Sequence, residues 1–213
     1  DVERSRGLGD VYKRQYHYRF MLGDAVSAAG RTRTAPAAGD LPGALRVAFA
    51  SCQRWEHGHY AAWRHLAADQ PDLVLYLGDY IYEYATPKTT TDLARTHSLR
   101  HATTLADYRD RYALHKSDPA LQLAHATCPW AVTWDDHEVQ NDYAADAGRG
   151  EAAGSAAFLA QRSAAWQAFY ENMPLRTTSL RGPASVTGWD TLQIYRRLRL
   201  SLIHISEPTR PLY

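Results

Sequence analysis

Residues 133–142, TWDDHEVQND, place a histidine among several carboxylates directly after a short apolar run. An acidic turn on the surface would have a similar composition. Two further stretches have the same form, an apolar segment followed by residue types that bind metals: ASCQ at 50–53 and LGDYIYE at 77–83. Carboxylates packed together raise one another's pKa, so such a cluster usually needs a cation. A metal site is therefore the chemistry to test, provided that the fold brings the three stretches together.

The apolar pattern predicts an α/β fold with these stretches at strand ends. LRVAFA at 45–50 and DLVLYL at 72–77 are expected to be strands, joined by a helix at 58–70 into a βαβ unit. DLVLYL has the nearly continuous apolar character of a strand buried on both faces. Further elements are expected at 16–22 (strand), 103–126 (helical region), 130–134 (strand), 151–172 (helix ended by Pro174) and 191–200 (alternating strand).

Loops beyond the carboxyl ends of strands in an α/β sheet converge on one crevice, where ligands bind. Three strands in succession end next to residues with ligand-type side chains, so their convergence predicts a metal site. The residues concerned are Cys52, Asp79 with Tyr82, and Asp135, Asp136 and His137.

The motifs ASCQ, LGDYIYE and WDDHE, in that order and each after a strand, resemble those of the PhoD-like alkaline phosphatases, a branch of the calcineurin-like metallophosphoesterases. GRTRTAP at 30–36, WEHGHYAAW at 55–63 and FYENMPLR at 169–176 extend the likeness over residues 16–200. The resemblance implies part of a metallophosphoesterase sandwich, built of βαβ units with a mixed sheet flanked by helices and preceded by the end of an N-terminal β domain.

The resemblance also assigns roles to residues of this sequence. Gly78, Asp79 and Tyr82 match a metal-binding GDxxD pattern in which tyrosine replaces the second aspartate, and Asp79 is expected to bridge metals. WDDHE matches a GNHD/E pattern, which makes Asp136 a ligand and places His137 beside the leaving group. Ser51-Cys52-Gln53 stands in place of a DxH pattern and gives Cys52 the role of a ligand.

Ferric iron and calcium are the cofactors that this set implies. A thiolate and a phenolate suit a highly charged, Lewis-acidic centre such as Fe³⁺, and aspartate oxygens suit Ca²⁺. Each assignment has a structural alternative: a buried strand cysteine at Cys52, a packing aromatic at Tyr82, or a turn-forming Asp136.

Three further residues have two open readings each. Asp135 either binds a metal directly or orients a neighbouring ligand. His137 either donates to the leaving group or bonds a backbone carbonyl. Arg54 either reaches a phosphate or pairs with a carboxylate.

Metal-dependent hydrolysis of phosphate mono- or diesters by an activated water is the function that the resemblance implies. A non-catalytic metal- or calcium-binding module would keep the ligands without turnover and is the alternative. A serine hydrolase is not indicated, because no GxSxG nucleophile elbow is present. Members of the family are typically exported, so an extracellular or periplasmic location is expected for the parent protein.

Composition restricts the class of protein further. The chain has 213 residues, 45% of them hydrophobic and 22% charged, as is ordinary for a globular domain. A net charge of +1 and a pI near 8.0 give no indication of binding to nucleic acid or to an anionic membrane. No run approaches the roughly 18 to 20 apolar residues that span a bilayer, and the first residues lack the apolar core of a signal peptide. Two cysteines do not form a disulfide framework.

The two ends differ in character from the middle. GDVYKRQ within residues 1–15 and LIHISEPTRP within residues 201–213 resemble translated sequencing-adapter DNA, although unusual natural tails are the alternative. The expected organisation is 1–15 as such a tail, 16–43 as the end of a β domain with a linker, 44–200 as the first part of the metallophosphatase domain, and 201–213 as a second tail. On this view the chain by itself has little or no phosphatase activity.

Overall fold

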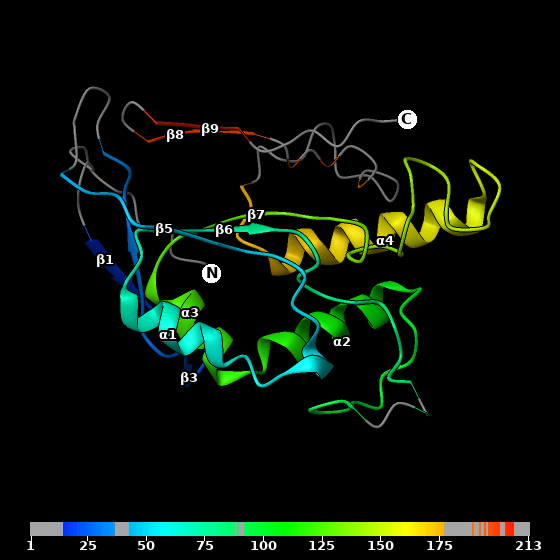
Figure 1. Ribbon diagram of the computed structural model, residues 1–213, viewed down its shortest axis with the longest axis horizontal. Coiled ribbons are helices and arrows are strands. Elements are labelled where there is room, and N and C mark those ends of the chain that lie inside the picture. The colour runs from blue at the N-terminus through cyan, green and yellow to red at the C-terminus, as the bar shows by residue number, and fades with distance from the viewer. Residues whose placement is uncertain are drawn as a thin grey trace.

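The computed structural model describes residues 15–36, 43–87, 89, 92–176, 189, 192, 194, 196–200 and 203–206. A parallel three-stranded sheet lies at its centre, in the order β5 (Val47–Ala50), β6 (Leu73–Leu77) and β7 (Trp130–Thr133) (Figure 1). Leu75 of β6 is aligned with Phe49 of β5 on one side and with Ala131 of β7 on the other. The carboxyl ends of the three strands therefore lie at the same edge of the sheet.

Four α-helices accompany the sheet: α1 (Ala61–Asp69), α2 (Leu105–Lys116), α3 (Pro119–Thr127) and α4 (Ala156–Asn172), with a short 3₁₀ turn, η1 (Trp55–His57), before α1. Helices α1, α2 and α3 lie on one side of the sheet in Figure 1. Helix α1 packs against α3, and α2 packs against α4.

Local sequence signals start these helices. Thr104 and Asp107 form a reciprocal capping box at the start of α2. The Asp118 carboxylate caps α3, whose first residue is Pro119, and the Ser155 hydroxyl caps α4.

Aromatic side chains fill the space between the sheet and the helices. The ring centroid of Trp130 lies 5.0 Å from that of Trp63 on α1 and 6.0 Å from that of Tyr76 on β6. Val74 and Val132 are fully buried beside them. Each such side chain contributes roughly 1.5 to 3 kcal/mol of hydrophobic stabilisation when removed from water.

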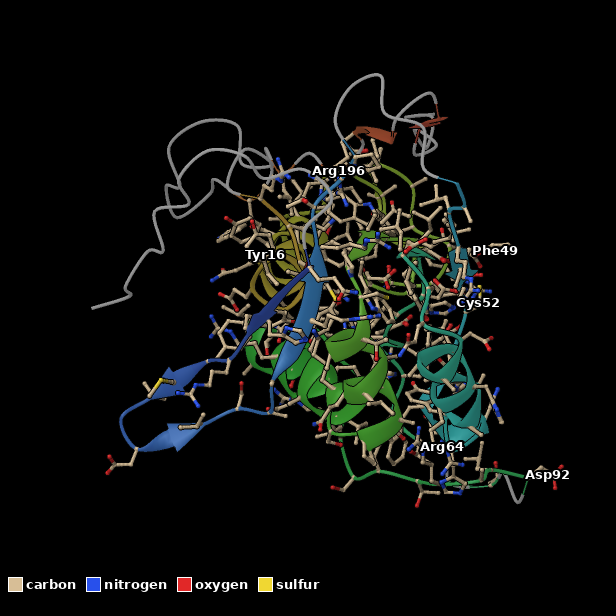
Figure 2. The ribbon with its side chains drawn as sticks, turned by 90° about the vertical axis from the view of Figure 1, so that its left-hand side faces the viewer. Tyr16, Phe49, Cys52, Arg64, Asp92 and Arg196 are labelled. Atoms are coloured by element: carbon tan, nitrogen blue, oxygen red, sulfur yellow. The ribbon has the colours of Figure 1, made fainter. Side chains whose placement is uncertain are left out.

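The other face of the sheet is partly open. Phe49 is 75% exposed and Leu77 is 42% exposed, and Figure 2 shows Phe49 at the outer surface, on the same side as Cys52. The expectation that DLVLYL is buried on both faces is therefore wrong at Leu77, because no described element covers the end of β6 there.

Short antiparallel pairs lie near both ends of the chain. β1 (Gln15–Tyr18) pairs with β4 (Gly30–Arg33), and β2 (Met21–Leu22) pairs with β3 (Ala25–Val26) to form a hairpin that projects from the body of the molecule (Figure 2). β8 (Arg197–Leu200) pairs with β9 (Ile203–Ser206).

Most expected elements are present, with shifted boundaries. The three strands of the sheet are confirmed. The helical region at 103–126 is two helices, because Asp118 and Pro119 end one and start the next. The helix expected from 151 starts at Ala156, after the Ser155 cap, and the strand at 16–22 breaks after Tyr18.

The parallel α/β core flanked by helices is thus observed. The mixed sheet, the complete sandwich, the N-terminal β domain and the proposed domain boundaries stay predictions, and residues 1–14 and 207–213 lie outside the described ranges. Within those ranges, no helix is long and apolar enough to cross a membrane.

Candidate metal centre

The loops after β6 and β7 leave the sheet side by side, because Leu77 and Thr133 are aligned in the parallel ladder. Gly78 follows Leu77 with a φ of +105°. A Cβ atom at this position would lie 2.5 Å from the Asp135 Cβ and 2.7 Å from the Asp135 nitrogen. Glycine is therefore required here both by the backbone conformation and by the close approach of the two loops.

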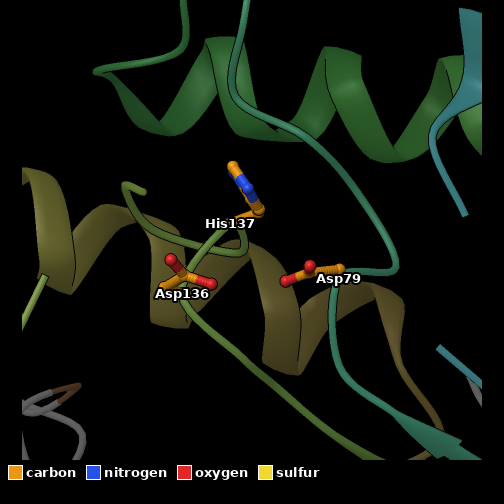
Figure 3. Close-up of side chains that lie close together, drawn as sticks. All are labelled: Asp79, Asp136 and His137. Carbon is orange, nitrogen blue, oxygen red and sulfur yellow. The ribbon is translucent and has the colours of Figure 1, made fainter. Parts of the chain in front are cut away.

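The two loops bring Asp79, Asp136 and His137 together. One potential ligand atom from each lies within 4.8 Å of those of the others, and Figure 3 shows the Asp79 and Asp136 carboxylates turned toward one another. Asp79 Oδ1 is buried and accepts no hydrogen bond from the described residues. Burial is the main cause that raises the pKa of Asp79, the charges of Asp135 and Asp136 add to it, and His137 and the Cys52 thiol act in the opposite direction. A cation between the carboxylates would satisfy the buried oxygen and offset the repulsion.

Tyr82 and Cys52 both lie next to the carboxylate of Asp79. The Tyr82 hydroxyl donates to Asp79 Oδ2 over 3.2 Å. Burial is the main cause that raises the pKa of the Tyr82 phenol above its usual range, and the Asp79 charge adds to it. Burial and the Asp79 charge likewise raise the pKa of the Cys52 thiol. Both groups interact with Asp79, but Cys52 is exposed and does not belong to the three-residue cluster, and the roles of Cys52 and Tyr82 as ligands stay predictions. Cys52 and Cys128 are both free thiols.

His137 is held by a buried carboxylate. Its Nδ1 lies 2.7 Å from Glu83 Oε2, and the other oxygen of Glu83 accepts the Asn141 backbone N–H over 2.9 Å. The imidazole also packs against the rings of Tyr82 and Tyr84, with centroids 4.3 and 5.2 Å away. Burial acts to lower the pKa of His137, but the hydrogen bond to Glu83 and the charge of Glu83 act against burial, and the pKa of His137 is raised. Since Glu83 occupies Nδ1, Nε2 is the ring nitrogen left for a ligand or a leaving group.

Arg54 lies beside the cluster rather than within it. Its guanidinium carbon is 5.9 Å from the Tyr82 ring centroid and 5.5 Å from that of Tyr84. Arg54 also pairs with buried Glu56, with Nε 3.4 Å from Oε2. The arginine thus has the carboxylate partner of one reading, and its contact with a phosphate stays a prediction.

Asp135 and Asp136 differ in their surroundings. Asp136 belongs to the three-residue cluster, and its Oδ2 also accepts the Asp142 backbone N–H over 2.6 Å. Asp135 lies outside the cluster, and its Oδ1 accepts the Asp136 backbone N–H over 3.0 Å. Its charge raises the pKa values of Cys52 and Asp79, although burial is the larger cause in both. Whether Asp135 binds a metal directly or orients a neighbouring ligand stays a prediction.

Two residues of the site have no role in the sequence motifs. Glu83 ends LGDYIYE and Glu138 ends WDDHE, and both are fully buried. Burial raises the pKa of Glu138 to about 8 even though backbone N–H groups donate to it. The signal that could have found them is the presence of a carboxylate in a segment that otherwise packs into the core, because a buried charge needs specific partners.

At the carboxyl edge of the parallel α/β sheet, the strand-end loops thus bring two aspartates and a histidine close enough to share one ion, with a tyrosine hydroxyl beside Asp79. A family profile described as PhoD-like phosphatase matches residues 47–202. The chain belongs to the PhoD-like phosphatase family.

Comparison with known proteins agrees with this membership. The chain is 47% identical over 185 residues to alkaline phosphatase D of Bacillus subtilis (strain 168), a match that covers 85% of the chain and 30% of that protein. It superposes on a solved structure described as PhoD with a TM-score of 0.79 and 46% identity, which covers 88% of the chain and 35% of that structure. The chain thus spans about a third of the length of the relatives it matches.

Proposed function

We propose that the chain carries the first part of the active site of a metal-dependent phosphoric ester hydrolase. The observation that supports this best is the meeting of Asp79, Asp136 and His137, whose ligand atoms lie within 4.8 Å of one another. Asp79 Oδ1, which is buried and has no hydrogen-bond partner among the described residues, also favours a cation at this place. Family membership supplies the reaction class, which is hydrolysis of phosphate esters.

The residues fit a centre that combines Fe³⁺ and Ca²⁺. Cys52 and Tyr82 would hold the iron together with Asp79, because a soft thiolate and a phenolate bind a strongly polarising cation. Asp79 and Asp136 would offer oxygen ligands to calcium. When bound, such cations would activate a water molecule and neutralise the charge on the phosphoryl oxygens.

The remaining residues would act on the substrate or on its leaving group. His137, oriented through Nδ1 by Glu83, would stabilise or protonate the departing oxygen. Arg54, over the Tyr82 and Tyr84 rings, would attract the phosphoryl group. Asp135 would orient the loop that carries Asp136. Small phosphate mono- or diesters are the proposed substrates, and export from the cytoplasm is the proposed fate of the parent protein.

A metal- or calcium-binding module without turnover is the second candidate. The described residues contain a single group of three potential ligands, and the chain spans 30% of the matched alkaline phosphatase. Such a chain would bind the cation and leave phosphate esters intact.

The test measures binding and turnover separately. The purified chain is freed of metal with a chelator and titrated with Ca²⁺ and Fe³⁺ under calorimetry, and the longer parent protein is treated in the same way and then assayed with 4-nitrophenyl phosphate and bis(4-nitrophenyl) phosphate. Metal-dependent turnover by the parent protein that Asp79→Asn abolishes, and that the exposed-site control Asp110→Asn retains, supports the hydrolase. Cation binding without turnover in the parent protein supports the second candidate, and no cation binding by either protein refutes both.

A further inference from the structure

Glu138 receives three backbone hydrogen bonds from two different loops. Its Oε2 accepts the N–H of Asp79 over 3.0 Å and the N–H of Asp135 over 2.7 Å. Its Oε1 accepts the N–H of Tyr80 over 2.5 Å. Asp79 and Tyr80 follow β6, whereas Asp135 follows β7. One oxygen atom of one side chain therefore bridges the two loops of the candidate metal centre.

This contact fixes the backbone at the positions where the ligands leave the sheet. Asp79 has a φ of 54°, in the left-handed region that costs free energy for a residue with a side chain. Its N–H points to Glu138 in this conformation. The Asp135 N–H, on the neighbouring loop, is adjacent to the Asp136 ligand position. Any shift of Glu138 would therefore move both candidate aspartate ligands.

Burying the side chain of Glu138 has a cost in free energy that general packing does not explain. The side chain is fully buried, and a buried carboxylate that is not well satisfied costs several kcal/mol. An apolar side chain of similar size would fill the same volume without that cost. However, it would leave three buried N–H groups without a partner. The two acceptor oxygens and the shape of Glu138 thus match the N–H groups of these two loops rather than the general needs of a core.

We infer that Glu138 is a positioning residue for the metal centre: its carboxylate ties the Asp79 loop to the Asp135–His137 loop and so sets the spacing between the ligands. Glu138 lies outside the group of three potential ligands, and each of its oxygens accepts a backbone N–H, so it acts through the loops rather than as a ligand. The inference rests on the proposed metal centre for its functional consequence, and on the hydrogen bonds alone for its structural content.

The experiment uses the 213-residue chain and Co²⁺ as the probe. Glu138→Gln keeps the size of the side chain but presents an amide group to N–H donors, and Glu138→Asp keeps the charge but shortens the reach. Glu151→Gln is the matched control, since Glu151 is an exposed carboxylate nearby in the sequence. Each variant is titrated with Co²⁺ at a temperature at which circular dichroism shows it to be folded. The dissociation constant and the visible absorption spectrum of the Co²⁺ complex are both recorded.

We expect both Glu138 variants to bind Co²⁺ about 10- to 100-fold more weakly than the wild type, as for other residues that orient ligands. Their Co²⁺ spectra should also change, because the ligand geometry changes, whereas Glu151→Gln matches the wild type in both readouts. A purely structural role would lower the melting temperature but leave the affinity and spectrum of the folded protein unchanged. That result, or wild-type binding by Glu138→Asp, would overturn the inference.

A measurement on the unmodified chain covers the case in which the variants do not fold. The amide protons of Asp79, Tyr80 and Asp135 should exchange slowly with solvent and resonate downfield in NMR spectra, as expected for N–H groups bonded to a carboxylate. Rapid exchange of these three amides would overturn the inference. Failure of the wild type to bind any cation would refute the proposed function instead, and the amide exchange would still decide whether Glu138 ties the loops.

Discussion

Replacing Asp79 with asparagine should have opposite effects on the metal-free and the metal-bound chain. Asparagine is nearly isosteric with aspartate and is one of the residues that tolerate the left-handed conformation observed at this position. Its side-chain oxygen can still accept from the Tyr82 hydroxyl. The substitution therefore removes one negative charge from the cluster with little other change.

The structure sets the size of the first effect. Two unit charges 4.8 Å apart repel by about 3.5 kcal/mol at an effective dielectric constant of about 20, and by about 0.9 kcal/mol in water. Asp79 is buried and Asp136 is intermediate in exposure, so we expect Asp79→Asn to stabilise the metal-free chain by about 1 to 2 kcal/mol.

The second effect has the opposite sign. A cation at 100 times its dissociation constant stabilises the folded chain by about 2.7 kcal/mol, whereas a site weakened 100-fold gains about 0.4 kcal/mol at the same concentration. Asp79→Asn should therefore lose nearly all of the stabilisation by metal. Asp135→Asn should lose less, because Asp135 lies outside the cluster, and a site weakened only about 10-fold would still gain about 1.4 kcal/mol at the same concentration.

Urea denaturation of each variant, with a chelator and with Ca²⁺ or Co²⁺, provides the assay. Asp110→Asn, an exposed change on α2, controls for the loss of a charge as such. Two results would refute the reasoning: a metal-free Asp79→Asn chain less stable than the wild type, or equal loss of metal stabilisation in Asp79→Asn and Asp135→Asn.

Three further changes have defined outcomes. Tyr82→Phe should shift or remove the visible charge-transfer band of the Fe³⁺-loaded protein, and a colourless wild type that binds zinc in place of iron would contradict the iron assignment. Gly78→Ala should destabilise the chain by about 1 to 3 kcal/mol in chemical denaturation, because the added Cβ would meet Asp135 at 2.5 Å; a neutral effect would contradict the close approach of the loops. Burial lowers the pKa of His125 to about 3, so the folded chain resists its protonation, and stability present above pH 6.5 is lost as the pH falls toward 3. His125→Gln should reduce the slope of stability against pH by roughly 1.4 kcal/mol per unit in that window, and an unchanged slope would show that His125 does not titrate there.

The sequence was sufficient to predict the parallel core and the edge at which the site lies. Apolar runs of strand length, each followed by ligand-type residues, placed the ends of β5, β6 and β7 correctly because the period and length of such runs follow directly from strand geometry. The membership of Asp79, Asp136 and His137 in one cluster followed from the same rule, since parallel strands deliver their loops to one edge.

The supporting contacts could not be predicted in the same way. Glu83 bonds groups 54 and 58 residues away. Two of the three donors to Glu138 lie 59 and 58 residues away, and no local pattern encodes such distances. The exposure of Leu77 was missed for a related reason. An apolar run shows that a strand can be buried on both faces, but whether a second layer covers it depends on other parts of the fold.

Two of the candidate ligand residues have a strained backbone conformation. Cys52 and Asp79 each follow a strand of the parallel sheet and each have a φ near 55°, where glycine would be free of strain. In both places the chain carries a ligand-type side chain instead, at a cost in stability. Tyr60 and Gln70 share this conformation, but they flank helix α1, where a left-handed residue ends or precedes a helix. At Cys52 and Asp79 no helix end accounts for it. Asp142 and Ala145 also have positive φ values away from helix ends, so the conformation is not confined to the candidate ligands. At Cys52 and Asp79 it coincides with two side chains that meet at the Asp79 carboxylate, so part of the backbone strain lies at the candidate site.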